Sequence, residues 1–205
     1  GTTPSYGTLR VCRENFQLPI FPIIRPRGGD FLYTEDEYES MRADVEIVKS
    51  LGCDGVVIGL LLSDGNIDLK RTALLREIAY PMEVTFHRAF DRCLDPYKAL
   101  EELISIGIDR ILTSGQCLTA PEGVELIAAL QKQANERIVI MPGSGVRPEN
   151  LSELKEKTGC KEFHSSLRGW KESKMQFRHP NFKDNNESYR NPTIDPEQVR
   201  GMKGD

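Results

Sequence analysis

Ser50-Leu51-Gly52-Cys53-Asp54-Gly55-Val56-Val57 is the stretch that decides the fold, because its pattern returns twice further along the chain. The later copies are SIGIDRIL at 105–112 and KTGCKEFH at 157–164. Each copy resembles a helix end, a glycine, a short turn and a strand. A glycine after a helix takes the left-handed conformation that closes the helix. One helix-to-strand connection used three times predicts stacked βα units.

The rest of the chain fits this unit. Apolar runs predict strands near 20–24, 56–60, 83–87, 110–114, 137–141 and 161–165. Helices are expected in the gaps and over residues 4–16. Capping residues and prolines predict helix starts near Thr34, Asp95, Thr119, Pro148 and Asp195. The polar stretch 169–193 predicts a long excursion or a mobile surface segment of a single domain spanning 1–205.

The alternation of residue types in one strand separates two architectures, a doubly wound sheet and a (β/α)8 barrel. Glu83, Thr85 and His87 alternate with Val84 and Phe86. A sheet covered by helices on both faces favours apolar residues on both, whereas the inside of a barrel tolerates polar ones. We therefore expect a TIM-type barrel. Six strands cannot easily close a barrel of eight, so part of the barrel is expected to be missing.

Composition narrows the class of protein. The 205 residues are 39% hydrophobic and 28% charged, with a net charge of −4, which argues against general nucleic-acid binding. The longest apolar stretch, 56–62, is too short to cross a membrane. Five widely spaced cysteines, without a CxxC, indicate reduced thiols in a cytoplasmic protein.

Charged residues gather where two of the strands end. Arg25, Arg27 and Asp30 flank the pair Gly28-Gly29, and FHRAFD at 86–91 supplies a second cluster. Ligands of parallel α/β proteins bind at these carboxyl ends. The alternative for the first cluster is a structural ion pair between Asp30 and either Arg25 or Arg27. The site residues we expect on one face are Arg25, Arg27, Asp30, His87, Arg88, Asp91, Ser114 and His164.

Two further features suggest ligands. Gly143, Ser144 and Gly145 follow an apolar strand, and such a loop either binds an anion through its N–H groups or simply turns. Cys93 and Cys117 fall in loops on the same face and are the candidate ligands for Cu(I), although a lone loop cysteine is usually a plain thiol. Cys12, Cys53 and Cys160 are expected to be mutually remote.

Several of these segments together resemble the copper homeostasis protein CutC family, namely PRGGDF at 26–31, DGVVIG at 54–59, VTFHRAFD at 84–91, RILTSG at 110–115, RIVIMPGSG at 137–145 and KEFHSS at 161–166. The resemblance implies a (β/α)8 barrel, a cytoplasmic location and a role in handling copper. It also implies that two strands precede residue 1, with cysteines suited to Cu(I). Ser144 departs from the resemblance, which leads us to expect glycine there.

Two classes of function follow. The resemblance favours copper binding or trafficking by a cytoplasmic protein. The arginines, His87 and the glycine loop favour an enzyme acting on a small anionic or phosphorylated metabolite, because Cu(I) prefers thiolate and thioether ligands. The exposed edges of an incomplete barrel lead us to expect a homo-oligomer.

Overall fold

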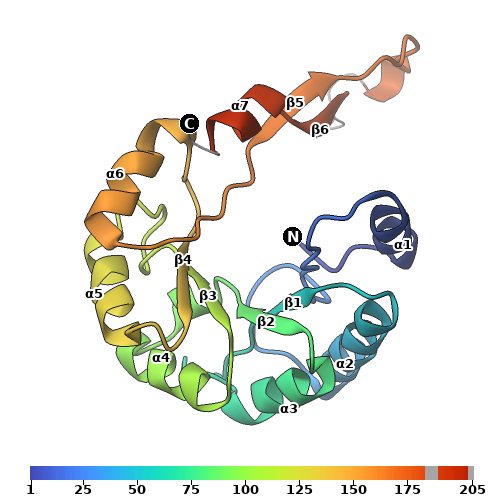
Figure 1. Cartoon of the computed structure of the whole chain (residues 1–205). Helices are drawn as coiled ribbons and strands as arrows, with labels where there is room; N and C mark the ends of the chain where they lie inside the picture. Colours follow the sequence, from blue (N-terminus) through green and yellow to red (C-terminus); the bar gives the residue numbers. More distant parts are fainter. Residues whose placement is uncertain (183–188, 203–205) are drawn as a thin grey trace.

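The computed structural model describes residues 1–182 and 189–202, in which helices and strands alternate (Figure 1). The elements are α1 (Tyr6–Asn15), α2 (Glu35–Ser50), β1 (Gly55–Ile58), α3 (Leu69–Ala79), β2 (Glu83–Phe86), η1 (Phe90–Arg92), α4 (Pro96–Ser105), β3 (Arg110–Thr113), α5 (Val124–Ala134), β4 (Val139–Pro142), α6 (Pro148–Thr158), β5 (Arg168–Glu172), η2 (Pro180–Phe182), β6 (Arg190–Ile194) and α7 (Pro196–Gly201). Within the described ranges no helix is long and apolar enough to cross a membrane.

The main sheet is parallel and follows chain order, β1-β2-β3-β4. The two outer segments predicted as strands join it through single bridges, Ile23 to Val57 and His164 to Gly143. The prediction of full strands at 20–24 and 161–165 is therefore wrong. In the first segment the reason is Pro22, which has no N–H to donate to a neighbouring strand. The order of the six segments is nevertheless the one predicted.

The sheet curves into an arc that is open on one side, with the helices on its outer face (Figure 1). This is a barrel of the TIM type that the described residues do not close. Val84 and Phe86 are fully buried on the helix side. On the inner side, Arg110 donates to Glu83 and Thr85, both at 3.3 Å. The alternation in the sequence thus identified the two faces correctly.

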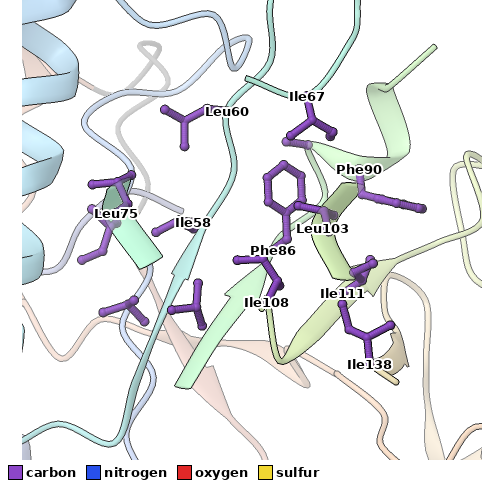
Figure 2. Packing of buried hydrophobic residues seen from close by; sticks show 14 of the residues in the cluster. Ile58, Leu60, Ile67, Leu75, Phe86, Phe90, Leu103, Ile108, Ile111 and Ile138 are labelled. Atoms are coloured by element: carbon purple, nitrogen blue, oxygen red, sulfur yellow. The ribbon is translucent and has the colours of Figure 1, made fainter. Parts of the chain in front are cut away.

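The hydrophobic core fills the space between the strands and the outer helices. Figure 2 shows Phe86 of β2 and Ile111 of β3 close to Phe90 and Leu103. All four side chains have no exposed surface. This packing fixes the strand ends, and with them the loops that follow each strand.

The repeated helix-to-strand connection has the predicted backbone. Gly52, Gly107 and Gly159 follow α2, α4 and α6 with φ angles of 72°, 74° and 70°. The capping box at Thr34 is also confirmed, since Thr34 and Glu37 exchange hydrogen bonds. Helix α5 begins later than its start signal at Thr119, because Gly123 packs closely against Gly115 before the helix starts.

The polar stretch near the C-terminus contains more regular structure than predicted. Strands β5 and β6 form an antiparallel hairpin that projects from the arc (Figure 1). The hairpin fits the predicted excursion, whereas mobility of this stretch stays a prediction; residues 183–188 lie outside the described part of the chain. After the hairpin, Gly201 at the end of α7 approaches the ring of Pro148. The organisation of 1–205 as one domain stays a prediction.

Candidate functional site

A cavity of about 780 Å³ lies at the carboxyl ends of the strands. It brings together four of the predicted residues, Arg25, Asp30, His87 and Arg88. Each of them follows a strand segment, so the curvature of the sheet directs their loops toward one another. The other side chains that line the cavity were not predicted as site residues, namely Ile23, Phe31, Leu61, Arg92 and Leu112.

His87 is the buried polar group of this cavity, with 4% of its surface exposed. The Ala89 N–H donates to His87 Nδ1 at 3.1 Å. Nε2 is buried and has no hydrogen-bond partner among the described residues. Burial, with a contribution from the nearby charge of Arg25, lowers the pKa of His87 to about 3. The imidazole is therefore neutral at physiological pH.

Gly59, at the end of the neighbouring strand segment, makes room for this imidazole. A Cβ atom at position 59 would lie 2.2 Å from His87 Nδ1. Sequence reasoning missed this role, although Gly59 closes the quoted segment DGVVIG. A glycine directly after an apolar strand was the available signal, because it marks a close approach.

Arg25 reaches the cavity from the segment that precedes β1. Its Nη2 donates to the Gly29 carbonyl at 2.7 Å and its Nη1 to the Gly1 carbonyl at 3.1 Å. The guanidinium lies over the Phe31 ring, 4.8 Å from the centroid. Nε is buried without a partner in the described part of the chain. Arg25 has no carboxylate partner there either, so its charge is not neutralised locally.

Arg27 has a different environment, although it is only two residues away. Its Nε donates to Glu37 of α2 at 2.6 Å, and Asp30 lies 3.0 Å from its Nη1. The Thr34 N–H and Arg27 together lower the pKa of Glu37. Arg27 does not line the cavity. Arg27 therefore forms the structural ion pair that the sequence left open as an alternative. Its contact with Glu37 ties the loop at 26–32 to α2.

Asp91 is the centre of a buried hydrogen-bond network. It accepts from the Thr113 hydroxyl at 2.6 Å, from the Ser114 N–H at 2.9 Å, and from Arg88 Nε at 2.7 Å. Arg88 also donates to Ser114 Oγ at 2.7 Å. Ser114 is fully buried. Asp91 and Ser114 therefore position the Arg88 side chain through hydrogen bonds, and Arg88 itself lines the cavity.

His164 and the glycine loop lie further round the arc. The predicted positions Gly143, Ser144, Gly145 and His164 do not line the cavity, although Gly143 packs against both His164 and Leu112. Ser144 has a φ of 76°, a conformation that favours glycine, which accounts for the expectation of glycine there. In the part of the chain that is described, the N–H groups of Ser144 and Gly145 donate to no acceptor.

The thiols are spread over the molecule. Gln116 donates to the Cys93 carbonyl at 2.7 Å, which joins the loops that hold Cys93 and Cys117. Burial and the charges of Asp91 and Asp95 raise the pKa of Cys93 to about 12. The described residues contain no group of three side chains suited to a metal.

One expectation about the other thiols is wrong. Burial raises the pKa of Cys53, and Cys12 contributes to this shift, so the two are close enough to interact. The Arg13–Asp54 ion pair, at 3.0 Å, explains this proximity, because it ties α1 to the turn before β1.

Arg92 is the most informative residue that sequence reasoning missed. It is exposed, lines the cavity, and has no ion-pair partner among the residues described. The signal was its place directly after FHRAFD, in the same strand-end cluster. With Arg25 it gives the cavity two guanidinium groups that form no ion pair with a described carboxylate, since Asp30 in the same lining pairs with Arg27.

Comparison with known proteins gives consistent matches. The CutC family model matches residues 1–169. A family protein CutC of Chromobacterium violaceum is 52% identical over 178 residues, which cover 87% of this chain and 72% of that protein. The human copper homeostasis protein cutC homolog is 49% identical over 178 residues, which cover 87% of this chain and 65% of the human protein.

Solved structures agree with the fold. The crystal structure of the putative copper homeostasis protein CutC from Streptococcus agalactiae matches with a TM-score of 0.77 and 34% identity, over 80% of this chain and 81% of that one. An aldolase matches with a TM-score of 0.61 over 77% of this chain and 73% of its own, and its 14% identity supports the fold alone.

Proposed function

The chain belongs to the CutC family of copper homeostasis proteins, and from this premise we propose that its cavity binds a small anionic or phosphorylated metabolite. The observation that carries the proposal is the charge of the cavity. Arg25 and Arg92 line it without a carboxylate partner in the described residues, and Arg88 adds a third guanidinium. Guanidinium groups suit carboxylate and phosphate oxygens.

The remaining lining supports a metabolite rather than a metal ion. Phe31, Leu61 and Leu112 supply apolar walls, which is the usual make-up of a small-molecule site. Cysteine and methionine are absent from the described lining, and these are the donors that Cu(I) prefers. The place of the cavity, at the carboxyl ends of parallel strands, is where TIM-barrel enzymes bind substrates.

Calorimetric titration with inorganic phosphate, sulfate and citrate tests the proposal. We expect saturable binding of at least one anion, and a loss of about tenfold to a hundredfold in affinity in Arg92→Gln, the usual effect of one charged hydrogen bond. Arg168→Gln is the matched control, because it removes the same charge from exposed strand β5. Equal losses in both variants, or no binding by the parent protein, would contradict the proposal.

Copper handling is the second candidate. The names of the relatives favour it, and Gln116 brings the loops of Cys93 and Cys117 together. Thiols are the right donors for Cu(I), but the raised pKa of Cys93 opposes the thiolate that the ion requires. We therefore expect only weak Cu(I) binding by this pair.

Two further expectations accompany these proposals. We propose a cytoplasmic location, which five free cysteines favour. We also propose a homo-oligomer, because the segments 20–24 and 161–165 leave backbone groups of the sheet edges open to a partner. Sedimentation velocity over a range of concentrations tests the second point, and a constant monomer mass would contradict it.

A further inference from the structure

Three buried side-chain atoms in the described residues lack a hydrogen-bond partner, and they share one region. They are Arg25 Nε, Tyr33 OH and His87 Nε2. Phe31 connects two of them, because Arg25 lies over its ring and the His87 ring centroid is 4.9 Å away. Tyr33 is a neighbour of Arg25, whose side chain opposes the rise in the Tyr33 pKa that burial causes. Buried polar groups are normally paired, so an unpaired cluster beside a cavity indicates a ligand that completes it.

The hydrogen bond at Nδ1 determines which ring nitrogen of His87 carries the proton. Nδ1 accepts from the Ala89 N–H at 3.1 Å, so Nδ1 carries no proton. A neutral imidazole has one proton, which must then be on Nε2. The unpaired atom is therefore an N–H donor, and it requires an oxygen acceptor rather than a proton or a metal ion.

We propose, resting on the function proposed above, that the ligand carries a neutral carbonyl or hydroxyl oxygen beside its anionic group, and that His87 Nε2–H donates to this oxygen. The anionic group faces Arg25, Arg88 and Arg92, which line the same cavity. His87 is then a fixed neutral donor that polarises the oxygen and does not act as a general base. The substrate class is a small oxo or hydroxy acid, or the phosphate ester of an oxo or hydroxy compound.

Access to His87 requires a local movement, because Nε2 is buried. Phe31 is the neighbour that can move, since it is only half-buried and follows the pair Gly28-Gly29. Gly29 has a φ of 89°, a conformation that glycine adopts freely. The Phe31 ring also lies against the Arg25 guanidinium, so the same rotation frees space beside both unpaired donors.

Matched pairs of ligands test the proposal. Pyruvate and propionate differ by one carbonyl oxygen beside a carboxylate, and hydroxyacetone phosphate and propyl phosphate differ by one carbonyl oxygen beside a phosphate ester. We expect the oxygenated member of one pair to bind about threefold to tenfold more tightly, the effect of one net hydrogen bond. If the oxygenated member binds more tightly only in the carboxylate pair, the anionic group of the natural ligand is a carboxylate. A preference only in the phosphate pair indicates a phosphate.

Two variants assign the preference to His87. His87→Gln keeps an N–H donor, so we expect it to retain the preference, whereas His87→Leu should lose it. Nitrogen-15 NMR of the imidazole at pH 7 needs no variant, and we expect a protonated Nε2 and an unprotonated Nδ1. A proton on Nδ1, or equal binding within both pairs, would overturn the inference while leaving anion binding intact. Failure of all four ligands and of inorganic phosphate to bind would overturn the proposed function as well.

Discussion

Single residues of the site differ in how their polar atoms are satisfied. Asp91 and His87 are both buried. Asp91 accepts hydrogen bonds from Thr113, Ser114 and Arg88, so it stabilises the fold. His87 has one ring nitrogen bonded and the other unpaired. Their sequence context is the same short cluster, yet the first is structural and the second is available to a ligand.

The burial of His87 predicts a pH-dependent stability. Its pKa falls from the ordinary 6.5 to about 3 in the folded protein, so only the unfolded chain takes up the proton between these values. The free energy of unfolding is therefore fully retained above about pH 6.5, and it should fall by about 1.4 kcal/mol per pH unit as the pH drops toward 4. Urea titrations at several pH values measure this slope.

His87→Gln provides the control for this slope. The variant lacks the titrating group, so its stability should depend less on pH over the same range. Burial also lowers the pKa of His164, so His164→Gln should remove a further but smaller part of the slope. An unchanged slope in His87→Gln would show that another group causes the dependence.

The hydrogen-bond network of Asp91 predicts that a single substitution at this position lowers the free energy of unfolding strongly. Asp91→Asn replaces one carboxylate oxygen by an NH2 group, which donates and does not accept, so some of the surrounding donors lose their partner. We expect a loss of about 2–4 kcal/mol in the free energy of unfolding, the usual cost of breaking a buried charged network. Asp30→Asn is the control, because its exposed pair with Arg27 should contribute about 0–1 kcal/mol. Equal losses in a urea titration would refute the distinction.

At the scale of elements, the connections between helices and strands are the most regular feature. Gly52, Gly107 and Gly159 all take the left-handed conformation. An added Cβ would meet nothing within 4 Å at any of the three. Glycine is required at these positions because of the positive φ angle, and not because a side chain would lack room.

Substitution of one such glycine tests this point. Gly107→Ala should lower the free energy of unfolding by about 1 kcal/mol, because alanine is strained at a φ of 74°. Gly107→Asn should cost less, since asparagine tolerates this conformation. Gly7→Ala within α1 is the control and should be neutral or stabilising. Thermal unfolding ranks the three variants, and a loss in Gly107→Asn as large as in Gly107→Ala would indicate a packing cause.

At the scale of the whole molecule, the arrangement of thiols predicts weak copper binding. Cys53 precedes β1 and Cys160 precedes the bridged segment 161–165, whereas Cys93 and Cys117 lie in loops after β2 and β3, at the opposite end of the sheet. A tight Cu(I) site needs at least two sulfurs within bonding distance. Competition against a Cu(I) chelator should show weak binding that Cys93→Ser and Cys117→Ser reduce further. Tight stoichiometric binding that survives both substitutions would place the site elsewhere.

Whole-molecule geometry also explains which site residues the sequence predicted and which it missed. Arg25, His87 and Arg88 were found because polar residues directly after apolar strands mark the strand ends. Arg27 was grouped with them, but its guanidinium turns to Glu37 on α2, a contact between segments ten residues apart. Arg92 and Gly59 were missed because their roles depend on neighbouring loops and strands, which local patterns do not describe.

The sequence by itself determined the βα repeat, the three helix-closing glycines, the polar inner face and the family, because these depend on residues close together in the chain. Only the tertiary structure decided that the outer segments join through single bridges and that Asp91 is fully engaged. It also decided that the His87 imidazole rests against Gly59 with Nε2 unpaired. The physical reason is that hydrogen-bond satisfaction and burial are set by packing between distant segments, and local residue patterns record neither.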